Sequence, residues 1–127
     1  MLATKDKIYT MLTTNVALLA LVGGADHIVS AWGETIEIFP LVIYQDENQS
    51  DMEFADNKPM ASSVRYRIDV FTTTDLASTT EIGQAIAIVM MADFFTCGTN
   101  GEVFEVTEGV KHRVMRFSRE LFTSDIL

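Results

Sequence analysis

The chain has 127 residues, of which 18 are acidic and 9 basic, so its formal net charge is −9. This length suits one domain over residues 1–127, and a composition that is 48% hydrophobic and 21% charged excludes an intrinsically disordered protein. The acidic balance argues against a protein whose main role is to bind phosphate backbones, and a single cysteine, Cys97, excludes an internal disulfide or a thiolate cluster.

The N-terminal residues predict one amphipathic helix. Apolar side chains recur there at three- and four-residue steps, at Ile8, Met11, Leu12, Val16 and Leu19. Gly23 and Gly24 are expected to end this helix, because glycine favours the backbone conformation found just after a helix. The following residues 26–37 are interpreted as a short strand at residues 27–29 and a loop.

The next segment, residues 38–45, reads as a strand that is apolar on both faces. One face carries Phe39, Leu41 and Ile43. The other face carries Val42 and Tyr44. When helices cover one side of an antiparallel sheet, the other side is normally polar, so this strand predicts a second cover. We expect a neighbouring subunit to supply it, with Phe39, Leu41 and Ile43 at the interface.

A long acidic loop is predicted at about residues 46–60. Its five carboxylates are Asp46, Glu47, Asp51, Glu53 and Asp56. Loops longer than about 12 residues are uncommon in compact domains and are usually functional or disordered. The loop is therefore either a segment that binds a partner or a solvated excursion of the chain.

The second half predicts further strands around one helix. Residues 63–71 alternate between apolar and polar side chains, which indicates a strand. A helix is expected to start at residues 72–75 and to be buried around most of its surface. Turns are predicted at residues 98–101 and 108–109, before a last strand at residues 110–122. The predicted class is α+β, with two helices on one face of a mainly antiparallel sheet in the order α-β-β-β-α-β-β.

The residues of catalysis and metal binding form no recognisable pattern. Cys97 could be paired with His27 or His112 as nucleophile and base, but it stands beside a turn without an oxyanion-hole signature, so a packed thiol is the better interpretation. His27 is interpreted as a partly buried strand residue and His112 as part of an exposed basic strand. We therefore expect no catalytic residue, no metal and no cofactor, and no apolar run is long enough to predict a membrane association.

Basic residues are concentrated near the C-terminus. Four of the nine lie within nine positions, at Lys111, Arg113, Arg116 and Arg119. Three interpretations remain open: a strand that binds nucleic acid, an ordinary exposed strand, or a surface that meets the acidic residues 46–56 of a second copy. A head-to-tail contact of the last kind closes into a ring when the rotation permits it.

The order of these segments resembles the tail-completion, or tail-terminator, proteins of long-tailed bacteriophages and related tail-like particles. The resemblance is carried by Ile8-Tyr9-x-x-Leu12 closing on Leu21-Val22-Gly23, by Phe39-Pro40-Leu41-Val42-Ile43-Tyr44-Gln45, by Arg67-Ile68-Asp69-Val70-Phe71 with the helix after it, and by the final strand at residues 110–122. Residues 25–38 depart from the family pattern, which often has a short basic-aromatic strand and a loop with proline and glycine.

The resemblance implies a structural virion protein at the head-proximal end of the tail, assembled in the host cytoplasm. It implies a ring, usually a hexamer, that caps the tail tube, stops its polymerisation and contacts the head-tail connector, while DNA passes through without specific binding. The expected partners are the protein itself, the tail tube protein and the connector protein. A different neck protein, or a cytosolic α+β domain that binds a small ligand, remains the alternative.

Overall fold

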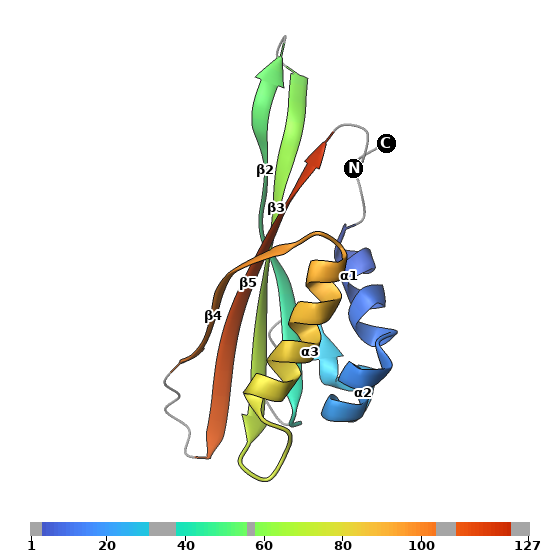
Figure 1. Ribbon diagram of the computed structural model, residues 1–127, viewed down its shortest axis with the longest axis vertical. Coiled ribbons are helices and arrows are strands. Elements are labelled where there is room, and N and C mark those ends of the chain that lie inside the picture. The colour runs from blue at the N-terminus through green and yellow to red at the C-terminus, as the bar shows by residue number, and fades with distance from the viewer. Residues whose placement is uncertain (1–3, 31–37, 56–57, 104–108, 123–127) are drawn as a thin grey trace.

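The computed structural model describes residues 4–30, 38–55, 58–103 and 109–122, which form helices packed on one face of a five-stranded sheet (Figure 1). The elements in chain order are α1 (Thr4–Thr13), α2 (Val16–Val22), the short 3-10 helix η1 (Ala25–His27), β1 (Ile28–Val29), β2 (Leu41–Ala55), β3 (Lys58–Thr73), α3 (Thr79–Ala92), β4 (Thr96–Val103) and β5 (Val110–Phe122). The strand order is β1-β2-β3-β5-β4, in which β1 runs parallel to β2 and the other neighbours are antiparallel. The predicted α+β class is confirmed.

The helix predicted at the N-terminus is in fact two helices. Asn15 separates them, and its side-chain oxygen accepts a hydrogen bond from the Leu18 backbone N–H at 2.9 Å, which makes Asn15 the N-cap of α2. An asparagine that can bond to nearby backbone competes with a continuous helix and favours a new start. Gly23 ends α2 as predicted, at φ 95°, with its N–H bonded to the Leu19 carbonyl oxygen.

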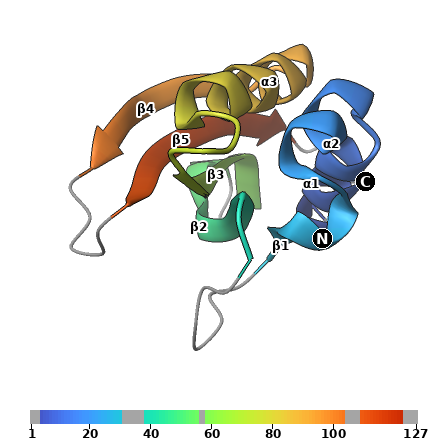
Figure 2. The same ribbon diagram turned by 90° about the horizontal axis from the view of Figure 1, so that it is seen from below.

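The main core lies between the helices and one face of the sheet. From the sheet it takes alternate residues of β3, as the sequence predicts, together with side chains of β2 and β5: Val42, Tyr44, Val64, Tyr66, Ile68, Val70, Met115 and Phe117. The helices contribute Ile8, Leu12, Leu18, Ile82, Ile86 and Met90. Helix α3 packs on β3, β4 and β5, and α1 contacts β1 (Figure 2). We call the opposite side of the sheet the open face.

The prediction of an acidic loop at residues 46–60 is wrong. The described residues of this range belong to two paired strands. Strand β2 extends to Ala55 and returns at Lys58 as β3, with register shifts at Asp46/Asn48 and near Glu53. The backbone groups of each strand bond to those of the other strand, and the polar side chains of these residues give no sign of this pairing. Asp56 lies outside the described residues.

The far part of this hairpin extends past the rest of the sheet. Strand β4 begins opposite Ser118 of β5, and β5 follows β3 only as far as the pair Ala61 and Phe122. We call residues 48–55 and 58–63 the hairpin arm; its residues 61–63 still pair with residues 120–122 of β5. It projects beyond the helices in Figure 1.

Helix α3 starts later than predicted. Its N-cap is Ser78, whose hydroxyl oxygen accepts from the Glu81 N–H at 3.1 Å, so α3 begins at Thr79 and not at residues 72–75. The preceding turn is fixed by the Thr72 hydroxyl, which donates to the Ala77 carbonyl oxygen at 2.8 Å. A serine followed three residues later by glutamate is a capping box, a stronger start signal than the threonines.

The surroundings of α3 also correct one prediction. Its outward side chains Ile88 and Met91 are exposed, so the helix is not buried around most of its surface. Gly83 packs on β5, where an added Cβ would lie 3.0 Å from Arg113 Cδ and 3.4 Å from Met115 Sδ.

One of the two predicted turns is wrong. Residues 98–101 lie inside β4, which pairs with β5 and has a register shift between Cys97 and Thr99. Gly109, at φ 82°, lies in the second predicted turn, directly before β5. Glycines at 98 and 101 therefore mark an exposed strand in place of a reversal of the chain.

Candidate functional site

The four basic residues of β5 do not form one surface. Successive side chains of a strand point to opposite faces of a sheet. Since Met115 and Phe117 belong to the helix-side core, positions 111, 113 and 119 share that side. Arg116 lies on the open face together with His112. The single basic surface predicted from the sequence is therefore divided between the two faces.

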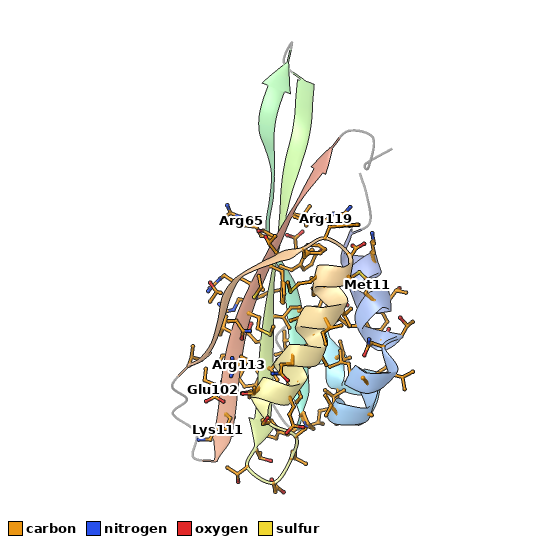
Figure 3. The ribbon with its side chains drawn as sticks, in the orientation of Figure 1. Met11, Arg65, Glu102, Lys111, Arg113 and Arg119 are labelled. Atoms are coloured by element: carbon orange, nitrogen blue, oxygen red, sulfur yellow. The ribbon has the colours of Figure 1, made fainter. Side chains whose placement is uncertain are left out.

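Arg113 holds elements of its own chain together. Its guanidinium donates to Asn100 Oδ1 at 2.8 Å, to Thr80 Oγ1 at 3.0 Å and to Thr79 Oγ1 at 3.4 Å. The Thr79 hydroxyl in turn donates to Glu102 Oε1 at 2.6 Å. Figure 3 shows Arg113 and Glu102 close to the start of α3. This arginine thus ties β5 to β4 and to α3, while Lys111 is exposed.

Arg119 is bound at the other end of α3. Its guanidinium and the ammonium of Lys7 each lie 3.1 Å from Asp93 Oδ2. It also lies 5.9 Å from the ring centre of Phe94. Phe94 is 77% exposed and has φ 67°, a left-handed conformation that is uncommon for residues other than glycine. The salt bridges stabilise the segment that presents this ring to solvent.

The apolar residues at the start of β2 are already covered within the chain. Leu41 and Ile43 are buried with Phe71, and Phe39, Val29 and Val110 pack against them. The open face at this point therefore has its own small core, and the argument that Leu41 and Ile43 need a second subunit as cover does not hold. A place for Phe39, Leu41 and Ile43 at a subunit interface stays a prediction.

Beside this small core lies a buried polar network centred on Asp69, which is fully buried. Asp69 accepts hydrogen bonds from Arg67 Nε at 2.8 Å, from Arg67 Nη2 at 3.0 Å and from His112 Nε2 at 2.6 Å. His112 also stacks on Phe71, with ring centres 4.1 Å apart. The prediction that His112 is exposed is wrong. Arg67 and His112 hold the Asp69 carboxylate in place, and the carboxylate in turn holds the Arg67 guanidinium.

His27 is half-buried, as predicted, but it is not a strand residue. It lies in η1 next to β1, and its Nδ1–H donates to the Pro40 carbonyl oxygen at 2.7 Å. This bond joins the segment before β1 to the start of β2.

Three arginines gather on the open face where β3, β5 and β4 lie side by side. Arg67 is directly opposite Arg116 across the β3–β5 pair, and Arg65 is opposite Ser118. We call Arg65, Arg67 and Arg116 the open-face arginines. Arg65 is exposed. The alternation within residues 63–71 puts Arg65 and Arg67 on one face of their strand, but it does not join them to Arg116, because that step needs the pairing of β3 with β5.

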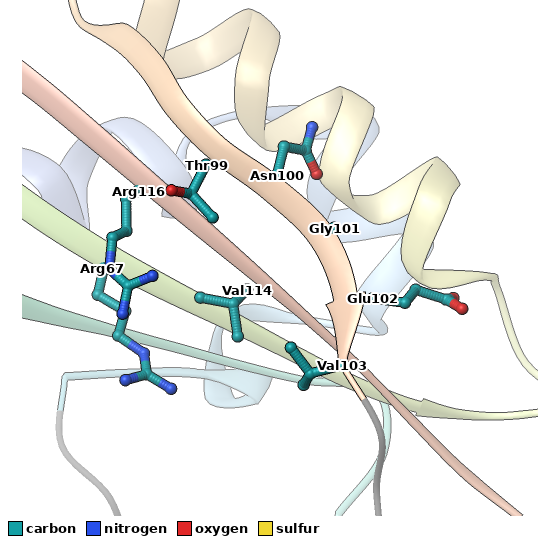
Figure 4. A pocket seen from close by; sticks show the side chains of 8 residues that line it. All are labelled: Arg67, Thr99, Asn100, Gly101, Glu102, Val103, Val114 and Arg116. Atoms are coloured by element: carbon teal, nitrogen blue, oxygen red, sulfur yellow. The ribbon is translucent and has the colours of Figure 1, made fainter.

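Shallow grooves accompany the open-face arginines. One, of about 400 Å³, is lined by Arg67, Arg116, Val114 and residues 99–103 of β4 (Figure 4). Another, of about 280 Å³, is lined by Arg65, Arg116, Gly98, Thr99, Phe117 and Ser118. An added Cβ at Gly98 or Gly101 would meet nothing within 4 Å, so the backbone of β4 is open here. Planar guanidinium groups in this setting suit carboxylate or phosphate ligands.

Exposed apolar side chains also occur on the helical side of the sheet. They are Val16 of α2, Ile88 and Met91 of α3, and Phe94 after α3, and they are between 56% and 80% exposed. A groove of about 320 Å³ lies between α2 and α3 and is lined by Ile88 and by Asn15, Ala17, Leu21, Glu81, Gln84 and Ala85. Exposed apolar side chains of this kind can contribute to protein-protein contacts.

The acidic residues of the predicted loop have no common place on the body of the protein. Asp46 is exposed on β2, and Glu47, Asp51 and Glu53 follow it along the same strand. The backbone pairs Asp51 with Ser62 and Glu53 with Ala61, in the hairpin arm. The backbone of the arm therefore places positions 51 and 53 beyond the helices.

The described residues offer little for redox or metal chemistry. Burial raises the pKa of the Cys97 thiol, and its Sγ lies 3.4 Å from the Thr99 carbonyl oxygen, so this thiol is not activated as a nucleophile. No group of three or more His, Cys, Asp or Glu side chains in the described ranges is arranged to hold a metal ion. Of the helices that the structure describes, none has the length and hydropathy to cross a membrane.

A known family of proteins matches most of the chain. The model of a family described as "Tail completion protein gp17" matches residues 6–118. The match covers the helices α2 and α3 and the sheet as far as Ser118 of β5, including residues 25–38. A search of curated proteins finds no match.

Proposed function

Because the chain belongs to the tail completion protein gp17 family, we propose that copies of it form a ring that caps the tail tube, ends its polymerisation and joins the tail to the head connector. Membership of this family makes the chain a structural component of a phage tail, and therefore of the virion. The proposed ring has six copies and lies at the head-proximal end of the tail.

The family match is the observation that carries this proposal, and the surfaces of the subunit support it. A ring subunit contacts a neighbour on each side, and a capping subunit also contacts the tube and the connector. The described residues provide separate surfaces for such contacts: the open-face arginines, the hairpin arm and the apolar side chains around Ile88. Strand β4 is also the last strand of its sheet, and an edge strand can pair with another chain.

The same features favour a binding role over catalysis. The buried carboxylate, Asp69, is bound by the side chains of Arg67 and His112, and the lone thiol is held protonated by burial. A charge of −9 also disfavours adhesion of DNA, since like charges repel. We propose that DNA passes through the ring without specific binding.

The proposal is tested by adding the purified protein to tail tube protein during its polymerisation. We expect tubes to stop growing and to show a ring at one end in electron micrographs. Tubes that grow as long as those without the protein would contradict the capping role. Binding to the connector with no effect on tube length would favour the alternative, another neck protein.

A further inference from the structure

Resting on the proposed ring, we infer that strand β4 of one copy pairs with the outer edge of β2 in the next copy, so that the two sheets join. The occupant of the β4 edge is thus a second copy of this chain. Contact between two different edges is heterologous, the kind that closes into a ring when the rotation permits it. Backbone groups and strand directions carry this contact, and it needs no particular side chain.

The described sheet has an open edge at each end. Among the strands that the structure describes, β4 has β5 as its only neighbour. At the other end, β1 pairs with β2 only at Val42 and Ile43, so none of the described strands lies beside residues 46–55 on that side of β2. A strand edge without a neighbour presents N–H and C=O groups to any chain that can pair with them.

Strand β4 is accessible to such a partner. Six of its eight residues are exposed, at positions 96, 98–100, 102 and 103. Edge strands commonly carry lysine or proline, which prevent pairing with another chain, and residues 96–103 contain neither. After the register shift between Cys97 and Thr99, β4 pairs with β5 without interruption as far as Val103. The outer edge of this part of β4 is therefore suited to accept a strand.

The strand directions of the two edges are compatible. Strands β2 and β5 run the same way, because each is antiparallel to β3, and β4 runs opposite to both. Copies in a ring are related by rotation about one axis, so a strand that runs mostly along this axis keeps its direction from copy to copy. Strand β4 of one copy and β2 of the next are therefore antiparallel, like the neighbouring strands from β2 to β4 within the subunit.

The offset between the two edges fits a sheet that closes on itself. Thr99 of β4 is level with Arg116 and, across β3, with Arg67. Ser50 of β2 is level with Ser63, which is four positions along β3 from Arg67. This offset is about 13 Å, and a repeat of four strands is about 19 Å wide. Pairing of Thr99 with Ser50 of the next copy thus tilts the strands by about 35°, and strands in closed sheets are tilted by about 35–45°.

The same register leaves room for β1. Counted from the Thr99–Ser50 pair, the eight residues of β4 lie opposite residues 46–53 of the neighbouring copy. Strand β1 pairs with β2 only at Val42 and Ile43, so β4 of the neighbour ends before it reaches β1.

The hairpin arm gains a third strand from this contact. At the tip of the arm, β2 and β3 are the only described strands that pair, since the pairing of β3 with β5 ends at Ala61. An isolated two-stranded hairpin is at best marginally stable in water. Strand β4 of a neighbouring copy lies along the arm and supports it. A second copy satisfies both open edges with one contact, which favours it as occupant over a strand of another protein.

Disulfide formation between introduced cysteines tests the pairing. Directly opposite residues of antiparallel strands have Cα atoms about 4.5–5.5 Å apart, a distance that a disulfide bridges. In a Cys97→Ser background, the variant with Thr99→Cys and Ser50→Cys should form a disulfide between neighbours under mild oxidation. A denaturing gel without reductant should then show a ladder of covalent multimers that ends at the number of subunits in the ring. Asn48→Cys in place of Ser50→Cys should react more slowly, because diagonal neighbours are about 7–8 Å apart.

Matched variants in the same background control for random collisions. Thr99→Cys alone and Ser50→Cys alone should stay monomeric on the gel, and their mixture should give dimers and nothing larger. Lys111→Cys together with Ser50→Cys places the second cysteine on β5, which has a strand on each side, and should give no ladder. Circular dichroism checks that each variant is folded.

Proline substitution tests the backbone contact without a covalent link. Successive residues of a strand direct their N–H groups to opposite sides, so of Asn100 and Gly101 one has its N–H toward β5 and the other outward. Proline is tolerated where the N–H of an edge strand faces outward. The one of Asn100→Pro and Gly101→Pro that keeps the fold should raise the dissociation constant for self-association by about tenfold. Sedimentation velocity measures the assembly.

The outcomes separate the ring from the contact. Wild-type protein that stays monomeric at high concentration would overturn both. Rings that form without covalent multimers from either double-cysteine variant on β4 and β2 would overturn the strand pairing and leave the ring. Covalent dimers from Thr99→Cys alone would show that β4 pairs with β4 of a second copy, and would also overturn the proposed contact. A folded proline variant that assembles as well as the wild type would count against it too.

Discussion

Replacing Asp69 by asparagine removes the charge at the centre of the buried network on the open face. Asp69 accepts three hydrogen bonds, two from Arg67 and one from His112. Asparagine has one acceptor oxygen, and its NH2 group would face a donor, so at least one of these bonds is lost. Breaking a buried charged pair costs about 3–5 kcal/mol. The Arg67 side chain is 29% exposed and regains some hydration, so we expect a loss of about 3 kcal/mol.

Urea unfolding followed by circular dichroism measures this loss. The free energy of unfolding of a domain is about 5–15 kcal/mol, so the variant should still fold but with a lower midpoint. For a slope of about 1–3 kcal/mol per molar urea, the midpoint falls by about 1–3 M at constant slope. Asp46→Asn, an exposed change on the adjacent strand, should alter stability by less than about 0.5 kcal/mol. An Asp69→Asn variant as stable as this control would refute the reasoning.

Further predictions concern single elements. Gly83→Ala should lower stability by about 1 kcal/mol in urea unfolding, because Arg113 is bound at three sites and cannot move from the new methyl group; a gain would mean that helix propensity prevails. Asn15→Ala should cost about 1 kcal/mol by loss of the α2 cap, and an unchanged midpoint would contradict the cap. Phe94→Gly should raise stability by up to about 1 kcal/mol, because glycine adopts the left-handed backbone conformation without strain. A clearly lower melting temperature in thermal unfolding would instead show that the exposed ring contributes packing. Cys97 should react with a thiol reagent at about pH 8 more slowly than free cysteine, because its raised pKa leaves less thiolate; equal rates would disprove the burial effect.

The sequence predicts well what depends on local periodicity. Alternation within residues 64–70 correctly assigns one side of β3 to the core, and the glycine after Val22 ends a helix where expected. It fails where a local side chain competes with the periodic pattern. Asn15 interrupts an apolar repeat that runs through both helices, and Ser78 takes over from Thr72–Asp75 as the helix start. In both cases a single hydrogen bond to a backbone N–H decides the boundary.

The other wrong predictions concern features that depend on contacts between residues far apart in the sequence. The polar residues of the hairpin arm resemble a loop because strand pairing, and not their side chains, satisfies their backbone. His112 looked exposed among basic neighbours, but its position opposite Phe71 on the paired strand brings it to Asp69. Such pairs lie 41 to 43 positions apart in the chain, and no pattern within either strand indicates the other.

The alternation of side chains between the two faces of a sheet also changes the interpretation of the basic C-terminal strand. Charge density along a sequence suggests one surface, but a strand divides consecutive side chains between two faces. Arg113 and Arg119 consequently bind the two ends of α3 and stabilise the subunit, whereas Arg116 joins Arg65 and Arg67 on the open face. Reversal of Arg113 would therefore test the fold and not the assembly. A test of the interface has to use residues whose bonds within the subunit are not needed for folding, and exposed Arg65 meets that condition best among the open-face arginines.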